Sequence, residues 1–182
     1  MAELELLNGT QTRPHFDRLI DIYQAAFSQP PYSESLPDFL NFAGRLSYHS
    51  RHSGFRCAII RPAPETEVTG FVYGFPGTIG DWFYDLVSHR LSPALRTQYL
   101  SDYFEFAEIA VLPAFQGQGQ GGQLHDLLLS GSKQSAACLA TPEDETNAHH
   151  LYRRREWVTL TRGIELPGST LRYEIMGKVL HT

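Results

Sequence analysis

The hydrophobic positions of this chain switch between a repeat of two, typical of strands, and a repeat of three to four, typical of helices. Strands are expected at residues 3–8, 55–61, 68–75, 103–111, 135–140, 157–164 and 171–179. Helices are expected from Pro14 to the Gln29–Pro31 break, from near Pro37 into the polar stretch 49–54, directly after the glycines at 117–122, and over 144–155. The Pro-rich turn at 62–66 favours an antiparallel hairpin between its two flanking strands.

This order of elements predicts an α/β protein of the α+β type, with a mixed and mostly antiparallel sheet. An aromatic and partly helical segment at about 77–102 interrupts the order before the strand at 103–111, and we interpret it as an insertion. The chain shows no repeat, no low-complexity tract and no linker long enough to separate two domains. We therefore expect a single domain over residues 1–182.

Composition and charge narrow the class of protein. The chain has 182 residues, of which 42% are hydrophobic and 19% charged, as is ordinary for a soluble globular protein. Its net charge of −5 argues against a nucleic-acid partner, which would require a basic face. No apolar run is long enough to span a membrane, and the N-terminus lacks the features of a signal peptide. These patterns predict a cytoplasmic protein that contacts neither nucleic acid nor membrane.

The cysteines and histidines indicate no metal site. Cys57 and Cys138 stand inside apolar strand segments, which favours two buried free thiols over a disulfide or a metal pair. No histidine pair is accompanied by further ligands at metal-binding spacing. We expect the following histidines at the surface: His49, His52, His149 and His150.

The stretch from Glu108 to Leu129 carries the strongest chemical signal. A strand stops at Pro113, and a short hinge leads into a glycine-dense loop and an amphipathic helix. Glycines allow close backbone approach and unusual φ angles, so several N–H groups can converge on one anion at the positive end of the helix. The pattern therefore predicts a phosphate site.

Two familiar phosphate sites fit this loop poorly. A Walker loop would need Gly-Lys-Ser/Thr, which is missing. Gly117, Gly119 and Gly122 match the dinucleotide pattern G-x-G-x-x-G, and acidic residues at 143–145 follow the next strand. A dinucleotide site, however, places its first glycine directly at the end of the strand, whereas the hinge 112–116 intervenes here, and too little chain follows for a doubly wound sheet.

A third pattern covers more of the chain. Residues 116–121 fit Q/R-x-x-G-x-G/A, and residues 108–113 before them read as a strand and its exit. Ala148–Trp157 resembles the segment A-x-x-L-Y-x-x-x-G-F/W. In these motifs and in its order of elements, the chain resembles the GNAT superfamily of acyl-CoA-dependent N-acetyltransferases. The resemblance implies a GNAT-like sheet of six to seven strands, splayed between the fourth and fifth and flanked by about four helices.

The resemblance also implies the co-substrate and its site. Acetyl-CoA would lie with its pyrophosphate on the loop amides and with its pantetheine arm along the main chain of the preceding strand, and no metal is implied. The loop residues are Gln116, Gly117, Gln118, Gly119, Gln120, Gly121 and Gly122, and the strand residues are Ile109, Ala110 and Val111. Gln116 replaces the commoner arginine, so binding here would depend more on backbone amides.

For the chemistry, the resemblance implies transfer of an acetyl group to a primary amine of a small molecule or peptide by direct attack on the thioester. Tyr152 matches the tyrosine that often protonates the leaving thiolate, and its alternative is a core position. Glu105 and Glu108 compete for the role of base, because a bulge in this strand can change which face points to substrate; either one can instead be structural. A non-catalytic acyl-CoA-binding domain of the same fold is the alternative function.

The resemblance also bears on the acceptor pocket, and at two positions the chain departs from the residues usual in the family. Tyr32, Trp82 and Tyr84 are candidate substrate-binding residues, although the insertion's aromatics can equally fill the core or a homodimer contact. Glu145 stands where many members have an asparagine near CoA. Glu156 replaces a glycine, so either the turn before the next strand differs or Glu156 adopts a positive φ.

Overall fold

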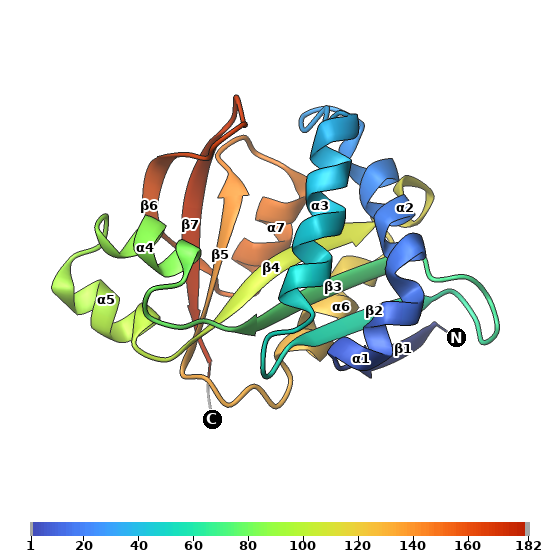
Figure 1. Cartoon of the computed structure of the whole chain (residues 1–182), viewed down its shortest axis with the longest axis horizontal. Coiled ribbons are helices and arrows are strands. Elements are labelled where there is room, and N and C mark those ends of the chain that lie inside the picture. Colours follow the sequence, from blue (N-terminus) through green and yellow to red (C-terminus); the bar gives the residue numbers. More distant parts are fainter. Residues whose placement is uncertain (1, 181–182) are drawn as a thin grey trace. The chain divides into compact units, whose positions relative to one another are not determined.

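The protein, described here by a computed structural model over residues 2–180, is built on a seven-stranded sheet (Figure 1). Its strands run in the order β1-β2-β3-β4-β5-β7-β6. Their bounds are β1 Glu3–Leu7, β2 Arg56–Arg61, β3 Gly70–Pro76, β4 Tyr103–Val111, β5 Ala136–Pro142, β6 Val158–Glu165 and β7 Arg172–Val179. The β4–β5 pair is parallel, whereas β1–β2, β2–β3, β5–β7 and β6–β7 are antiparallel. The mixed sheet of an α/β protein is confirmed.

The chain forms two compact units that share strand β4. Among the described residues, one contains 2–75 together with Glu108–Ser130, and the other contains Pro76–Ala107 together with 131–180. The single domain expected over residues 1–182 stays a prediction.

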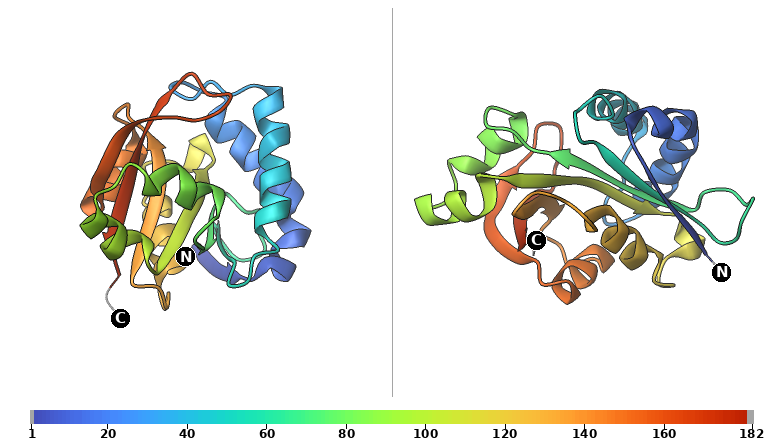
Figure 2. Two further views of the ribbon diagram at one scale, coloured as in Figure 1. Left: turned by 60° about the vertical axis from the view of Figure 1, so that its left-hand side comes forward. Right: turned by 90° about the horizontal axis from the view of Figure 1, so that it is seen from below.

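The first unit packs helices on both faces of β1, β2 and β3. Helices α2 (Phe16–Phe27) and α3 (Leu36–His49) cover one face, and α6 (Gln120–Leu129) packs against β1 and β2 on the other (Figure 2). The apolar repeat of each helix supplies buried side chains to this core, as the pattern predicts. They include Leu19, Ile22, Phe42, Leu46, Leu124 and Leu128. The four-residue helix α1 (Gly9–Thr12) shows no periodic pattern and was not predicted, although an Asn8–Gln11 capping box begins it.

The second unit is organised around β5 and β7, with helix α5 (Pro93–Leu100) against them. The segment 77–102 forms α5 and α4 (Trp82–Ser88), and α7 (Asn147–Arg154) follows β5 in the chain. Residues of the 77–102 segment lie in one buried cluster with strand residues, so much of this segment belongs to the unit's core. The cluster contains Phe83, Val87, Leu91, Tyr99, Leu100, Tyr103, Ala136, Cys138, Ile164 and Ile175.

Strand β4 pairs with β5 over a short distance. The parallel register joins Tyr103, Glu105 and the residue between them to Ala136–Cys138, which are three residue pairs. Strand β5 continues to Pro142 and is paired with β7 along its whole length. A short β4–β5 ladder is the pairing that a sheet splayed between these strands would show.

The turn that ends α7 resolves the question raised by Glu156. Glu156 has φ +63°, its N–H donates to the Arg153 carbonyl, and the Trp157 N–H donates to the Tyr152 carbonyl. This is the Schellman arrangement, in which a left-handed residue ends a helix and glycine is usual. The turn therefore keeps the geometry of a glycine turn and places a glutamate in the left-handed region.

We expect Glu156→Gly to raise the free energy of unfolding by about 0.5–1 kcal/mol, because relief of left-handed strain exceeds the entropy cost of a glycine. The ion pair with Lys178, at 3.7 Å and with Glu156 85% exposed, contributes little. Urea denaturation measures the change. Glu156→Gln is the control, since it removes the charge and keeps the strain; equal stability of the two variants would contradict the prediction.

Candidate active site

The glycine loop has the backbone that an anion site requires. Gly117 has φ +73° and Gly119 has φ +83°, and Gly119 is the N-cap of α6. A Cβ built on either residue would meet nothing within 4 Å, so backbone conformation rather than crowding demands glycine there. The N–H groups in the first turn of α6 have no partner within the helix. These donors and the open space beside them fit a pyrophosphate.

The glutamines of the loop use their side chains to hold it in place. Gln116 Nε2 donates to the Val111 carbonyl at 2.9 Å, and Gln118 Nε2 donates to the Ala114 carbonyl at 3.0 Å. The backbone N–H of Gln116 donates to Pro113 in the short 3₁₀ turn Pro113–Phe115. The backbone N–H of Gln116, one of the expected phosphate donors, is therefore already engaged by the Pro113 carbonyl.

Thr69, which sequence reasoning missed, joins three elements beneath the loop. Its hydroxyl donates to Gln120 Oε1 at 3.0 Å, its N–H donates to Ile60 of β2, and its carbonyl accepts the N–H of Leu112 after β4. Thr69 and Gln120 are both buried. The start of α6 is thus fixed to the sheet by a buried side-chain hydrogen bond.

If the loop holds acetyl-CoA, as the family resemblance implies, we expect Thr69→Val to raise the KM for acetyl-CoA about tenfold with a smaller change in kcat. The substitution leaves the buried Gln120 oxygen unpaired and loosens the loop. The free energy of unfolding should fall by about 1–2 kcal/mol. Steady-state kinetics with varied acetyl-CoA measures the first effect. Thr69→Ser keeps the hydroxyl and should restore KM; a serine variant as impaired as the valine variant would refute the role of this hydrogen bond.

Glu108, in the part of β4 that belongs to the first unit, has a carboxylate in poor contact with water. Its side chain is 18% exposed, and Arg45 Nη2 of α3 lies 3.6 Å from its Oε2. Burial raises the pKa of Glu108 to about 8, although the Arg45 guanidinium lowers it, and Glu34 raises it further. A carboxyl with this pKa can accept a proton near neutral pH.

Tyr23, Glu34 and Arg45 surround Glu108 with further polar groups. The Tyr23 ring stacks on the Phe42 ring at 3.8 Å between centroids. The Arg45 guanidinium lies over the Phe42 ring as well, 5.7 Å from its centroid. Burial raises the pKa of Glu34, while its hydrogen bond to the Tyr23 hydroxyl lowers it. Within the described residues, Glu34 Oε2 is buried without a hydrogen-bond partner. Sequence reasoning missed these residues as parts of a site, because they come from distant parts of the chain. The signal that could have pointed to a site was the charge of Arg45, three residues after Phe42 on the apolar side of the helix.

Glu105, the other candidate base, lies in the second unit. It pairs with Cys138 across the β4–β5 ladder. Burial raises its pKa to about 8, and the carboxylate of Asp81 raises it further. Both candidates therefore have the pKa of a base that works near neutral pH.

Tyr152 lies on α7 within an aromatic group of the second unit. Its ring meets Phe106 edge-on at 5.9 Å between centroids and lies 5.8 Å from Trp157. The residue is 5% exposed. Its ring is thus held in one orientation by Phe106 and Trp157.

The three candidate acceptor residues differ in exposure. In the first unit, Tyr32 lies between α2 and α3, half-buried with its ring edge-on to Phe27 at 4.7 Å. In the second, Trp82 is 60% exposed, whereas Tyr84 packs against the buried cluster. Of the two candidates in the 77–102 segment, Trp82 is therefore more accessible to a ligand than Tyr84.

The acidic residues that a dinucleotide site would need have other partners. Glu143 Oε1 accepts the N–H of Gly163 at 2.5 Å, and Glu145 forms an ion pair with Arg153 of α7. Each of these two carboxylates is thus engaged through one oxygen. Glu145 stands where many members of the resembled family have an asparagine near CoA, and here its carboxylate pairs with Arg153.

Of the histidines expected at the surface, His150 is exposed, His49 and His52 are half-buried, and His149 is buried. His49 is half-buried, with Nδ1 3.1 Å from the Tyr73 hydroxyl, and burial lowers its pKa to about 4. His149 is 1% exposed and bonds to Glu174. The expectation is wrong for His149 and met only in part by His49 and His52, because the helical pattern does not show which strand a histidine will face.

Over residues 2–180, no group of three or more His, Cys, Asp or Glu side chains is placed to hold a metal ion. No helix in this part of the chain has the length and apolar character needed to cross a membrane. Cys57 and Cys138 are buried free thiols, and burial raises the pKa of Cys57 to about 12.

Comparison with known proteins decides the family. The model of the acetyltransferase (GNAT) family matches residues 16–157. The chain belongs to the GNAT acetyltransferase family. The resemblance carried by the glycine loop and the Leu151–Tyr152 segment is thereby confirmed.

The relatives agree with this family. A curated relative, the GCN5-like protein acetyltransferase Rv2170 of Mycobacterium tuberculosis, is 34% identical over 119 residues. The match covers 61% of this chain, and the chain spans 58% of the length of that relative. The ribosomal-protein-S18-alanine N-acetyltransferase from Escherichia coli has the same fold, with a TM-score of 0.63, 16% identity, and coverage of 100% of this chain and 96% of that one.

A second solved structure agrees. Arabidopsis thaliana NAA60 in complex with acetyl-CoA gives a TM-score of 0.65 at 14% identity, covering 99% of each chain. At these identities the likeness shows the fold alone. The GNAT-like fold class is confirmed.

Proposed function

We propose that this GNAT protein transfers an acetyl group from acetyl-CoA to a primary amine of a small molecule or peptide. The observation that carries the proposal is the half-buried Glu108 carboxylate, whose pKa is raised to about 8 in the part of β4 nearest the glycine loop. Family membership and the backbone of the loop support acetyl-CoA as the donor. The structure of a relative with acetyl-CoA bound supports it as well.

In the proposed reaction, each group of this chain has one task. The amides of 117–122 and the main chain of 109–111 hold and orient the co-substrate, which supplies an activated thioester. Glu108 removes a proton from the acceptor ammonium, so that the amine attacks the acetyl carbon directly. Tyr152 protonates the sulfur as the C–S bond breaks. The acceptor nitrogen loses two protons, one to Glu108 before the attack and one to the Tyr152 phenolate as the tetrahedral intermediate collapses. Tyr152 is thereby restored, and Glu108 passes its proton to water, so the reaction releases one proton in all.

The surroundings of Glu108 favour it over Glu105. Once ionised, Glu108 offers a carboxylate to a cationic amine, and Glu34 is a second acidic group beside it. Glu108 also directly precedes the strand residues proposed to hold the pantetheine arm. Glu105 has the same pKa and stays the second candidate.

Acceptor identity is the part of the proposal that relatives help to narrow. One relative is named a protein acetyltransferase and a structural neighbour acts on an alanine of a ribosomal protein. Peptides with free N-termini therefore belong in a screen beside small amines, with Tyr32, Trp82 and Tyr84 as proposed acceptor contacts. The cytoplasmic location and the homodimer contact stay predictions.

Calorimetry and a thiol-release screen test the function. We expect acetyl-CoA to bind at micromolar concentration and NADH not to bind, and at least one amine among amino acids, polyamines, aminoglycosides and peptides to release CoA. Binding of NADH in place of acetyl-CoA would overturn the proposal. Binding without turnover on any amine would instead favour the non-catalytic acyl-CoA-binding domain.

A further inference from the structure

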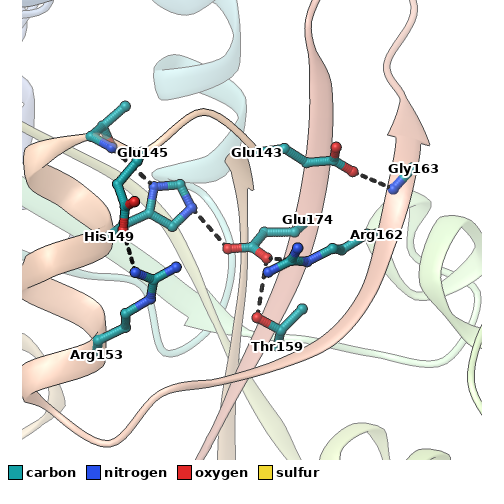
Figure 3. Close-up of polar contacts among 9 residues, drawn as sticks. Glu143, Glu145, His149, Arg153, Thr159, Arg162, Gly163 and Glu174 are labelled. Atoms are coloured by element: carbon teal, nitrogen blue, oxygen red, sulfur yellow. Dashed lines mark hydrogen bonds and ion pairs between the residues drawn. The ribbon is translucent and has the colours of Figure 1, made fainter.

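A buried carboxylate in the second unit joins one helix to two strands. Glu174 of β7 has a side chain that is 2% exposed. Its Oε1 lies 2.8 Å from His149 Nε2 of α7, and its Oε2 accepts from Thr159 Oγ1 and Arg162 Nε of β6, both at 3.1 Å (Figure 3). All three donors converge on this single side chain.

The contacts of His149 define which ring nitrogen carries the proton. Its Nδ1 accepts the backbone N–H of Thr146 at 3.3 Å in the capping box that begins α7. Nε2 is then the nitrogen that donates to Glu174. His149 is thus held at both ring nitrogens, and it connects the N-terminus of α7 to the buried carboxylate.

Tyr152 follows His149 by three residues on α7, so both side chains lie on one face of the helix. At the other end of the helix, the turn at Glu156 and the contact with Trp157 hold the chain. The His149–Glu174 pair is therefore a polar contact between α7 and β7 one turn before the proposed acid. A second one lies at the end of the helix, where Lys178 Nζ of β7 donates to the Arg155 carbonyl at 2.6 Å.

The energetic balance suggests a role beyond stability. A buried carboxylate loses much of the gain from its hydrogen bonds to desolvation, and apolar replacements of buried polar pairs are often as stable. Such a pair does, however, specify one arrangement where an apolar contact would tolerate several. A displacement of about 1 Å of a catalytic group can cost about a hundredfold in rate.

We propose that His149 and Glu174 are positioning residues, which place the Tyr152 hydroxyl for proton donation by fixing α7 on β7. The inference rests on the proposed role of Tyr152 in acetyl transfer. Both side chains are buried, and in this proposal they act through Tyr152.

A double-mutant cycle tests the inference. We expect His149→Leu to lower kcat about 10- to 100-fold with the KM for acetyl-CoA nearly unchanged, and to have no further effect when Tyr152 is already phenylalanine. His149→Gln can accept from Thr146 and donate to Glu174, and should restore most of kcat. Thr159→Val is the matched control, since it removes a hydrogen bond from the same carboxylate without touching α7, and should leave kcat unchanged. Rates are referred to the concentration of acetyl-CoA-binding sites, so that unfolded protein does not count.

A second measurement does not require activity. In a Trp82→Phe background Trp157 is the remaining tryptophan, and its ring is 5.8 Å from Tyr152. His149→Leu should shift its emission to the red, and Thr159→Val should not.

Additive losses in the cycle, or equal losses for His149→Leu and His149→Gln, would overturn the inference. Unchanged turnover of Tyr152→Phe would overturn it too, while the rest of the proposed function stands. If no amine is acetylated, the proposed function fails, and the Trp157 emission alone then decides: an unchanged spectrum in His149→Leu overturns the positioning of α7.

Discussion

Glu108→Gln is expected to lower kcat/KM for the acceptor by about 100- to 10,000-fold, the range by which a positioned base accelerates proton transfer. Glutamine has nearly the same shape and cannot accept the proton. The wild-type kcat/KM should rise with pH through about 8, because only the ionised carboxylate acts as a base. This rising limb should be lost in the variant, as measured by pH profiles of initial rates.

Glu105→Gln is the matched control, since it removes a carboxylate of the same strand and the same raised pKa. It should retain most of the activity and the rising limb. If Glu105→Gln loses the limb and Glu108→Gln keeps it, the base has been assigned to the wrong glutamate.

Glu108→Gln should also change the free energy of unfolding in a defined pH window. Glu108 has a folded-state pKa of about 8 against an ordinary value of 4.5, so the folded protein holds a proton that the unfolded chain releases. The contribution of protonated Glu108 to the free energy of unfolding is fully present below pH 4.5 and is lost as the pH rises to about 8. Above that window Glu108→Gln should be more stable than the wild type, by on the order of a few kcal/mol. Urea denaturation at several pH values measures this difference.

Tyr152→Phe should lower kcat by about 100-fold or more with little change in the KM for acetyl-CoA, because the leaving thiolate loses its proton donor. The ring contacts with Phe106 and Trp157 do not need the hydroxyl, so the fold should persist. The loss should shrink with acetyl thioesters whose thiols are more acidic, since these leave without protonation. Steady-state kinetics over a series of donors measures it.

The control for this prediction is Tyr99→Phe, a change at another buried tyrosine of the second unit. It should leave the dependence on the donor thiol unchanged. A Tyr152→Phe enzyme with wild-type turnover would show that Tyr152 only fills the core, which was its alternative interpretation.

Much of the fold follows from local patterns. The strand expected at 103–111 is β4, Tyr103–Val111, and the helix expected from the glycines is α6. The pattern succeeds because alternating and helical repeats record which side of an element faces apolar surroundings. The four-residue α1 was missed for the same reason, since it is too short to show a repeat.

The positions that depend on backbone geometry were also readable. Gly117 and Gly119 adopt positive φ, as a loop of close-approaching amides requires. Glu156 replaces a glycine and adopts φ +63°, one of the two possibilities that its sequence context left open. Each of these is a local constraint, so the surrounding residues were sufficient to detect it.

The sequence by itself determined the family, the order of the main elements and the glycine loop before α6, because these depend on neighbours within one turn or one strand. Only the tertiary structure decided the environments that tune reactivity. Arg45 and Glu34 reach Glu108 from more than sixty residues away, and Glu174 meets His149 across 25 residues. A pKa depends on desolvation and on charges a few ångströms away in space. Those distances exist only once the chain is folded.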